Sequence, residues 1–193
     1  LKLAEAHALT IVEDDTYGWL APVQATRLAA LDQLQRTVTV GGFAKILTPA
    51  WRVGWLAASP ALVERAIERK LLTTLCAPGL SERAIAIALE QGALRRHAER
   101  VVQRLAAARA RAVRLAQDAG FAFAVPPRGL YGWVDAGVDT DRLATALHAQ
   151  GWLLAPGSLF HVAARPGNLM RVNFAAAQEA RIWRTLRTAR EAL

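Results

Sequence analysis

The sequence predicts an α/β protein in which a mainly parallel sheet with helices is followed by a small α+β domain. Two observations indicate this order. In the first half, short apolar runs rich in β-branched residues alternate with helical stretches, as is typical of buried parallel strands. After a long stretch rich in arginine and alanine, two amphipathic helices lie among several short strands, which is an α+β pattern. With 193 residues, of which 53% are hydrophobic, the chain is long enough to bury a core.

Three strands are expected in the first half. Each is a short apolar run, and together they cover residues 8–13, 37–40 and 53–58. The segment between the first two strands, residues 17–33, is expected to be mostly loop, with Pro22 as a breaker. The first strand ends in acidic residues, at the position where α/β folds place contacts to ligands.

Two helices are expected after the third strand. The first extends to about Leu72, with Ser59 as its cap and Pro60 at the first helical position. Ser81 is expected to cap the second helix, and Gly92 is expected to interrupt it. Helices that follow strands in this way can cover the faces of a parallel sheet.

A long helix is expected over residues 94–119, closed by Gly120. Beyond it, strands are expected at residues 121–125, 132–135, 151–154 and 170–174, and helices at 140–150 and 178–193. The change of pattern divides the chain into two parts. We expect one part over residues 1–92, with alternating strands and helices, and a small α+β domain over residues 93–193, with the long helix as the bridge.

The net charge of +8 raises the question of a nucleic-acid surface. Much of the positive charge falls on residues 95–114 and 181–190, where arginine alternates with alanine and leucine at helical spacing. The first of these stretches contains no aromatic residue. We therefore favour solvated, arginine-rich helix faces over a nucleic-acid groove, which stays the alternative.

The sequence gives no indication of a membrane or secreted protein. No apolar run approaches the roughly 18 residues of a membrane span, and the first seven residues resemble the polar end of a helix rather than a signal peptide. Cys76 is the single cysteine, so a reducing, cytoplasmic location is expected. Because Leu1 is not an initiator Met and enters in the middle of an element, we expect this chain to be a fragment of a longer polypeptide.

Two stretches supply side chains that could hold pyridoxal 5'-phosphate (PLP). The first gives an acid and a phenol three residues apart, Asp14 and Tyr17, and the second places Lys45 seven residues before Arg52. A lysine amine can form a Schiff base with the aldehyde of PLP, and an acid can keep the pyridine nitrogen protonated. A phenol can hydrogen-bond the ring oxygen, and a guanidinium can bind the phosphate.

Each of these residues has a simpler interpretation when it is taken alone. An acid at the end of a strand commonly caps the next turn, and Asp15 competes with Asp14 for either role. Lys45 lies in an apolar run, so we expect burial to desolvate it, although it could also extend from the end of a strand into solvent. Arg52 could be a surface arginine stacked on a neighbouring tryptophan. The combination is more specific than its parts.

The order of these motifs resembles that of the class I/II aminotransferases of PLP fold type I. The motifs are Asp-x-x-Tyr, Gly-Phe-Ala-Lys and Pro-x-x-Arg-x-Gly-Trp, which end at Tyr17, Lys45 and Trp55. Three later segments resemble further family motifs, at residues 126–133, 154–160 and 169–174. The resemblance covers essentially the whole chain. It implies the C-terminal portion of the PLP-binding large domain followed by the small domain.

The resemblance implies a role for five residues. Lys45 would bond the cofactor and move a proton between the substrate α-carbon and the cofactor. Asp14 would pair with the pyridine nitrogen, Tyr17 would bond the ring hydroxyl, and Arg52 would bind the phosphate. Arg171 would bind the α-carboxylate of an amino acid, because a bidentate fork suits a planar carboxylate. No metal ion is expected.

The chain departs from the family pattern in two ways. Gly42 and Ala44 stand where the family often has serines near the lysine, which suggests fewer contacts to the phosphate. The family's phosphate loop, the aromatic residue that stacks on the ring and an asparagine at the ring hydroxyl all precede the point that corresponds to Leu1. We therefore expect PLP to bind in the full-length protein, and weakly or not at all to this chain alone.

The resemblance leaves two main functions open. We favour the effector-sensing domain of a GntR/MocR-type transcriptional regulator, because residues 13–18, 137–141 and 170–175 look like that group. The alternative is a class I/II aminotransferase that transfers an amino group between an amino acid and a 2-oxo acid, with activity only in the full-length chain. A non-catalytic remnant is disfavoured because all five residues are present.

Both functions imply the same partners for this chain. An amino acid or a 2-oxo acid is the expected ligand, and a homodimer is the expected assembly. Nucleic acid would be bound only through a domain upstream of Leu1, and no membrane contact is expected.

Overall fold

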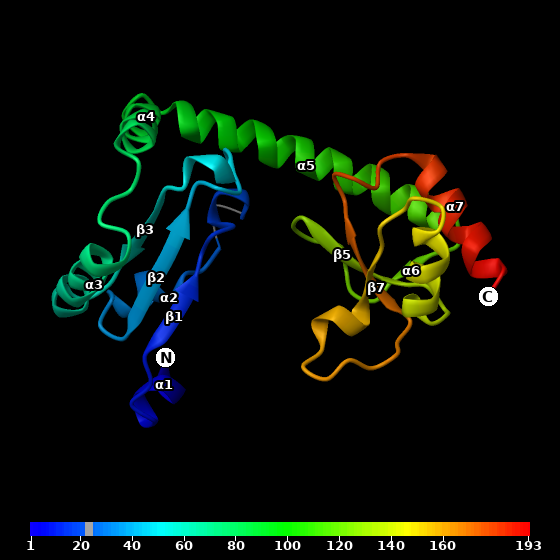
Figure 1. Ribbon diagram of the computed structural model, residues 1–193, viewed down its shortest axis with the longest axis horizontal. Coiled ribbons are helices and arrows are strands. Elements are labelled where there is room, and N and C mark those ends of the chain that lie inside the picture. Colours follow the sequence, from blue (N-terminus) through cyan, green and yellow to red (C-terminus); the bar gives the residue numbers. More distant parts are fainter. Residues whose placement is uncertain (22–24) are drawn as a thin grey trace. The chain divides into compact units, whose positions relative to one another are not determined.

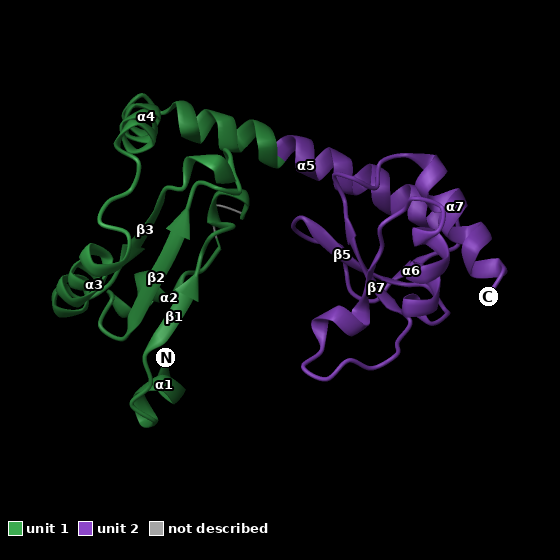
Figure 2. Cartoon of the chain, in the orientation of Figure 1, with its two compact units in different colours: residues 1–102 green, residues 103–193 purple. Residues whose placement is uncertain are grey.

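The computed structural model describes residues 1–21 and 25–193, so the predicted breaker Pro22 lies outside the described residues. Two compact units divide the chain, Leu1–Val102 and Gln103–Leu193 (Figure 2). Each unit has a sheet and a hydrophobic core of its own.

The sheet of the first unit has three strands in the order β1-β2-β3 (Figure 1), with bounds β1 Ile11–Asp14, β2 Thr37–Gly42 and β3 Gly54–Ala57. β1 and β2 pair in parallel, with Asp14 opposite Val40. β2 and β3 pair antiparallel, with Gly42 opposite Gly54. All three predicted strands are present, but β3 was predicted as a buried strand and is instead mostly exposed, and it pairs antiparallel rather than parallel. Because parallel strands end at the same edge, the residues that follow β1 and β2 leave the sheet side by side.

Helices and short 3₁₀ turns connect these strands. Their bounds are α1 Lys2–Ala6, η1 Gly18–Leu20, α2 Leu28–Asp32, η2 Pro49–Trp51, α3 Pro60–Thr73 and α4 Gly79–Glu90. The predicted loop between β1 and β2 therefore contains two short helical segments. Ser59 precedes α3 as predicted, but its backbone carbonyl rather than its side chain accepts hydrogen bonds, from the N–H groups of Leu62 and Val63.

The predicted cap of α4 is wrong. Ser81 lies inside the first turn of this helix, and Pro78 precedes it. Pro78 has an extended backbone, and its carbonyl accepts a hydrogen bond from the N–H of Glu82, so the helix begins at Gly79. A serine inside the first turn cannot act as the N-cap, because the cap residue must itself be extended.

The first unit has a small core. Its buried members are Phe43, Ile46, Ile85, Leu94 and Ala98. Several large apolar side chains of this unit are exposed, among them Leu72 at 79% and Leu80 at 87%.

The long helix α5 (Ala93–Asp118) confirms the prediction over 94–119, and the boundary between the two units falls within it. Gly120 ends it with φ +78°, in the left-handed region that glycine adopts at no steric cost. The N–H of Phe121 reaches back to the carbonyl of Ala116, as in a Schellman-type ending. Among the described residues, no helix is both long enough and apolar enough to cross a membrane.

The second unit has an antiparallel four-stranded sheet in the order β4-β5-β7-β6. Its elements are β4 Ala122–Phe123, β5 Tyr131–Asp135, α6 Thr140–His148, β6 Ala155–Pro156, η3 Gly157–Phe160, β7 Leu169–Asn173 and α7 Ala180–Glu191. The core is larger than that of the first unit and includes Phe174, Leu143, Met170 and Trp183, all nearly inaccessible. The predicted α+β pattern is confirmed.

One strand of this unit is displaced from its predicted range of 151–154. Gly151 has φ +80°, and the N–H of Trp152 donates to the carbonyl of Leu147, so these residues close α6 instead of forming a strand. Pairing with β7 begins only at Ala155, which lies opposite Arg171.

Candidate functional site

Three of the predicted site residues follow the strand ends at one edge of the first sheet. Asp14 is the last residue of β1, and its neighbour β2 ends at Gly42. The chain between β2 and β3 then carries both Lys45 and Arg52 before it returns to the sheet. Parallel pairing of β1 with β2 therefore places the acid beside the loop that bears the amine and the guanidinium.

Lys45 and Tyr17 come together at this edge. The Nζ atom of Lys45 lies 5.3 Å from the centroid of the Tyr17 ring, which is within the range of a cation–π contact. The two residues are 28 positions apart in the sequence. The structure thus brings the predicted amine and the predicted phenol into contact.

The expected burial of Lys45 is wrong. Its neighbours Phe43 and Ile46 enter the core of the first unit, whereas the Lys45 side chain is exposed. The apolar residues of this segment therefore anchor the turn, and the lysine extends from it. The amine is accessible at the same edge as Asp14.

His97 of α5 contacts the turn that carries Lys45. Nothing in the sequence predicted this contact. Its Nε2 lies 3.0 Å from the backbone carbonyl oxygen of Ile46, the residue after Lys45. Because a carbonyl can only accept, the ring nitrogen is the donor. The turn is further closed by hydrogen bonds from the N–H groups of Ile46 and Leu47 to the carbonyl of Phe43.

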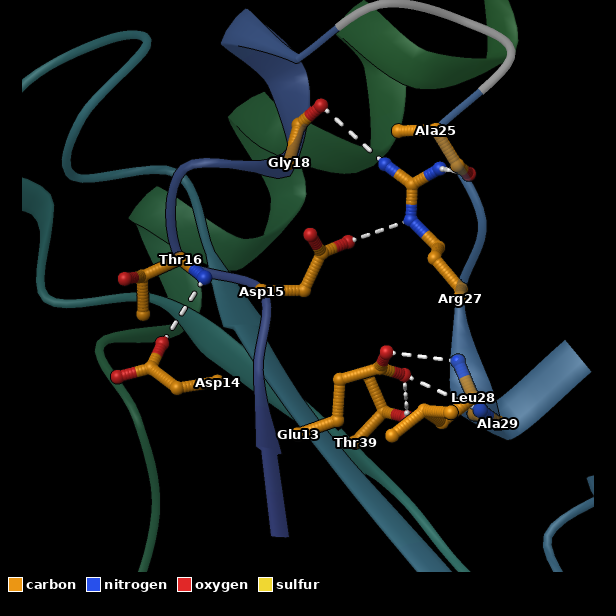
Figure 3. A network of polar contacts seen from close by, with 10 residues as sticks. All are labelled: Glu13, Asp14, Asp15, Thr16, Gly18, Ala25, Arg27, Leu28, Ala29 and Thr39. Atoms are coloured by element: carbon orange, nitrogen blue, oxygen red, sulfur yellow. Dashed lines mark hydrogen bonds and ion pairs between the residues drawn. The ribbon is translucent and has the colours of Figure 1, made fainter. Parts of the chain in front are cut away.

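The structure distinguishes Asp14 from its neighbour Asp15. The carboxylate of Asp15 pairs with Arg27, with Nε 2.8 Å from Oδ2. Asp14 points to the other side of the strand (Figure 3) and accepts the N–H of Thr16 at 3.0 Å. This hydrogen bond lowers the pKa of Asp14, so the carboxylate is ionised near neutral pH. Asp15 is committed to an ion pair, while Asp14 is an exposed anion with no cationic partner among the described residues.

Glu13 anchors the same loop. Its carboxylate accepts the N–H groups of Leu28 and Ala29, at 2.7 and 3.1 Å, and the hydroxyl of Thr39 at 3.3 Å (Figure 3). Burial by itself raises the pKa of Glu13, but these hydrogen bonds and the charge of Arg27 outweigh it and leave the pKa below its ordinary value. The carboxylate thereby fastens the start of α2 to the sheet.

Arg52 adopts a backbone conformation that is uncommon for a side chain with a Cβ. Its φ is +53° and its ψ is +37°, in the left-handed region, at the end of η2. One guanidinium nitrogen, Nη1, donates to the carbonyl of Pro49 at 3.3 Å, and the side chain is exposed. The remaining donors of the guanidinium have no acceptor among the described residues.

Arg171 belongs to the second unit, on the central strand β7. Its guanidinium carbon lies 4.4 Å from the ring centroid of Tyr131 and 4.6 Å from that of Phe160. It lies opposite Trp133 of β5 and Ala155 of β6. The side chain is half-buried, and among the described residues it has neither a hydrogen bond nor an ion pair. The sequence predicted neither aromatic contact, although Tyr131 and Phe160 lie in the two segments that resemble family motifs, residues 126–133 and 154–160.

The four groups of the first unit fit PLP by their chemistry. An ionised carboxylate, a phenol, an accessible amine and a guanidinium with free donors follow the ends of neighbouring strands. No group of histidine, cysteine, aspartate or glutamate within residues 1–21 and 25–193 could hold a metal ion.

Comparison with known proteins identifies the family. The family model described as "Aminotransferase class I and II" matches residues 1–188. Aromatic-amino-acid aminotransferase 1 of Thermococcus litoralis is 29% identical over 191 residues, which cover 94% of this chain and 45% of that protein. The HTH-type transcriptional regulator TauR of Rhodobacter capsulatus is 35% identical over 179 residues, which cover 86% of this chain and 35% of that protein. The chain spans half or less of the length of these relatives.

Solved structures show the same fold. The kynurenine aminotransferase of Pyrococcus horikoshii, determined in complex with PMP, superposes with a TM-score of 0.85 at 26% identity and covers 100% of this chain and 50% of its own. LysN of Thermus thermophilus, complexed with N-(5'-phosphopyridoxyl)-L-leucine, has a TM-score of 0.84 at 20% identity, over 99% of this chain and 52% of its own. The predicted fold class and family are confirmed, and the chain belongs to the class I and II aminotransferases.

Proposed function

We propose that this chain is the lysine-bearing part of a PLP-binding, aminotransferase-like domain that senses an effector in a GntR/MocR-type transcriptional regulator. The observation that carries the proposal is the contact of Lys45 with Tyr17 at the edge where Asp14 is an exposed carboxylate with no cationic partner among the described residues. Bound PLP supplies an aldehyde that an amine can bond and a ring that withdraws electrons from a substrate carbon.

Each residue of this edge would have a separate task. The Nζ atom of Lys45 holds the cofactor and gives or takes a proton. The Asp14 carboxylate accepts a hydrogen bond from a protonated ring nitrogen, which its lowered pKa favours. The Tyr17 hydroxyl donates to a ring oxygen, and Arg52 offers its free guanidinium donors to the phosphate.

Arg171 would bind the carboxylate of an amino acid or a 2-oxo acid. A guanidinium presents two parallel N–H donors that match the two oxygens of a carboxylate. The absence of an acceptor for Arg171 among the described residues supports this role, because a half-buried guanidinium is stabilised by a hydrogen-bonding partner.

The regulator is favoured because regulators are among the more identical relatives. TauR is 35% identical to this chain, and the HTH-type regulator YisV of Bacillus subtilis is 33% identical over 140 residues, 69% of this chain and 29% of that protein. We propose that nucleic acid binds only through a domain that precedes Leu1 in the parent protein. About 70 residues of winged-helix pattern, the size of a small DNA-binding domain, upstream of the aminotransferase-like region would support the regulator.

The second candidate is an aminotransferase that moves an amino group between an amino acid and a 2-oxo acid. The match to the aminotransferase of Thermococcus litoralis covers 94% of this chain and supports this candidate. A start codon directly before the aminotransferase-like region of the parent gene would decide for the enzyme.

We also propose a cytoplasmic homodimer. The single Cys76 is exposed and is compatible with a reducing compartment. The exposed apolar side chains on α3 and at the start of α4, among them Leu72 and Leu80, would be covered by a second copy, since patches of this kind commonly mark interfaces. We further propose that residues 1–92 end the large domain and that 93–193 form the small domain, with residues 94–119 as the bridging helix.

The test is to map where PLP becomes attached. The complete polypeptide that contains this chain is incubated with PLP, reduced with borohydride and digested for mass spectrometry. Within these 193 residues there are only three lysines, Lys2, Lys45 and Lys70, so labelled peptides from this part of the polypeptide are readily assigned. We expect the label on Lys45, its loss in Lys45→Ala, and no change in the matched control Lys70→Ala.

Equal labelling of Lys70, or labelling that survives Lys45→Ala, would contradict the proposal. The isolated 193-residue chain should label weakly.

A further inference from the structure

Arg171 lies over two aromatic rings that come from different elements. Tyr131 is the first residue of β5, and Phe160 is the last residue of η3. The guanidinium carbon is 4.4 Å from one ring centroid and 4.6 Å from the other. A third ring, Trp133, meets Phe160 edge to face at 5.0 Å, which restrains the Phe160 ring.

This arrangement restricts how a ligand can reach Arg171. The central carbon of the guanidinium lies over both rings, whereas the N–H donors point outward in the plane of the group. A ligand must therefore approach along the edge of the guanidinium. An acceptor with two coplanar oxygens, such as a carboxylate, can then engage two donors at once.

The segment that carries Phe160 is fixed to the second unit at two points. The hydroxyl of Ser158, which is buried, donates to Oδ1 of Asp141 on α6 at 2.6 Å. At Gly157 the backbone comes so close to β7 that an added Cβ would lie 2.6 Å from the carbonyl oxygen of Leu169. The ring of Phe160 is therefore set by η3 as a whole and not by its own burial, since it is 43% exposed.

We propose that Phe160 is a positioning residue that, together with Tyr131, holds the Arg171 guanidinium in the orientation that receives a carboxylate edge-on. The proposal rests on the proposed role of Arg171 as the carboxylate site. The Ser158–Asp141 hydrogen bond affects Arg171 only indirectly, because it holds the segment that carries Phe160. Neither Phe160 nor Ser158 touches the ligand in this arrangement.

The first part of the test needs no cofactor. The Nε–H signal of Arg171 is followed by NMR in the 193-residue chain and is assigned by its loss in Arg171→Lys. We expect aromatic ring currents to displace this signal from those of the exposed arginines. Phe160→Leu should move it toward the exposed arginines, whereas the loop control Leu159→Ala, a residue 70% exposed, should leave it in place. An unchanged signal in Phe160→Leu would overturn the proposal.

The second part measures what the orientation does for binding. Titration with pyruvate should shift the Arg171 signal, and methyl pyruvate, which lacks the charge, should not. Phe160→Leu should weaken pyruvate binding about fivefold, as expected for loss of one partly desolvated cation–π contact. Phe160→Tyr should restore binding, and Ser158→Ala should give a smaller loss.

The outcomes separate this proposal from the function on which it rests. If Arg171→Lys abolishes pyruvate binding and Phe160→Leu leaves the affinity unchanged, the carboxylate role stands and the positioning role of Phe160 is wrong. If pyruvate binds equally well to Arg171→Lys, the carboxylate role is wrong and the positioning proposal falls with it.

Discussion

Arg171 contacts two aromatic rings in the unit with the larger core, whereas Lys45 extends into solvent from a turn in the unit with the smaller core. The two residues are the proposed contacts for the substrate carboxylate and for the cofactor. In the second unit, two aromatic side chains from different elements contact the functional residue. In the first unit, the loops around the functional residue are held by hydrogen bonds in which Glu13 accepts and Arg27 and His97 donate.

The stability of the two units therefore depends on different interactions. Burial of large apolar side chains is worth several kcal/mol each, and it is lost when the side chain is truncated. Hydrogen bonds at an exposed edge contribute about 1 kcal/mol each. The second unit should therefore respond most to core substitutions, and the first to the loss of its polar network.

The largest effect is expected for Trp183→Ala. Trp183 is 1% exposed, its ring centroid lies 5.7 Å from that of Phe121 in a tilted arrangement, and its Nε1 donates to the carbonyl of Ala177. We expect a loss of roughly 3–5 kcal/mol in the free energy of unfolding of the second unit, measured by urea denaturation. Leu153→Ala, at a side chain 89% exposed, is the control and should change the free energy by less than about 0.5 kcal/mol. A similarly small loss for Trp183→Ala would break the contrast between the units.

The next effect is expected for Glu13→Ala. This change removes the acceptor of two backbone N–H groups and of the buried Thr39 hydroxyl. We expect the first unit to lose about 1–2 kcal/mol in its free energy of unfolding, again by urea denaturation. Glu13→Gln retains one acceptor oxygen and should lose less. If both variants lose the same amount, the carboxylate hydrogen bonds are not what anchors α2.

The same residue gives a pH dependence. The pKa of Glu13 is lower in the folded chain than its ordinary value of 4.5. A carboxyl group with a lowered pKa binds more protons in the unfolded chain, so its contribution to stability is present above the ordinary pKa. That contribution is lost as the pH falls through the lower pKa of the folded state. We expect this part of the acid destabilisation to be absent in Glu13→Gln. The free energy of unfolding is measured from pH 6 to pH 3, roughly the range in which carboxyl groups titrate.

A smaller effect of opposite sign is expected for Arg52→Gly. The left-handed backbone at Arg52 costs about 1 kcal/mol for a residue with a Cβ, and glycine removes this cost. Thermal unfolding should show the first unit stabilised by up to about 1 kcal/mol, while PLP labelling of Lys45 in the complete polypeptide falls. Arg52→Lys should retain the free-energy cost of the left-handed backbone and lose the paired guanidinium donors. Stabilisation with full labelling would show that Arg52 has no role at the phosphate.

The smallest effect on folding is expected for the double variant Leu72→Lys and Leu80→Lys. Both side chains are largely exposed, so the free energy of unfolding should change by no more than about 0.5 kcal/mol. If a second copy covers these residues, sedimentation should show a shift from dimer to monomer. Val162→Lys, at an exposed position of the second unit, is the matched control. A dimer that persists in the double variant would place the interface elsewhere.

Local spacing determined most of the fold. The short β-branched runs became β1, β2 and β3, and the arginine-rich stretch became α5, because a strand or a helix depends on residues two to four positions apart. The two errors, at Ser81 and at residues 151–154, both concern how a helix begins or ends. There the backbone of Pro78 and of Gly151 decided the outcome, and many residues can occupy such positions.

The candidate site was predictable as a set of residue types and only partly as an arrangement. The amino-acid sequence alone shows the ordered set of Asp14, Tyr17, Lys45, Arg52 and Arg171. This set was enough to predict the family, which the family model confirms. Tertiary structure alone distinguished Asp14 from Asp15, which pairs with Arg27, and left Lys45 exposed while its neighbours Phe43 and Ile46 were buried. It also brought Tyr131 and Phe160 into contact with Arg171. These contacts join residues far apart in the chain, and their distances depend on strand pairing and loop closure, which no local spacing encodes.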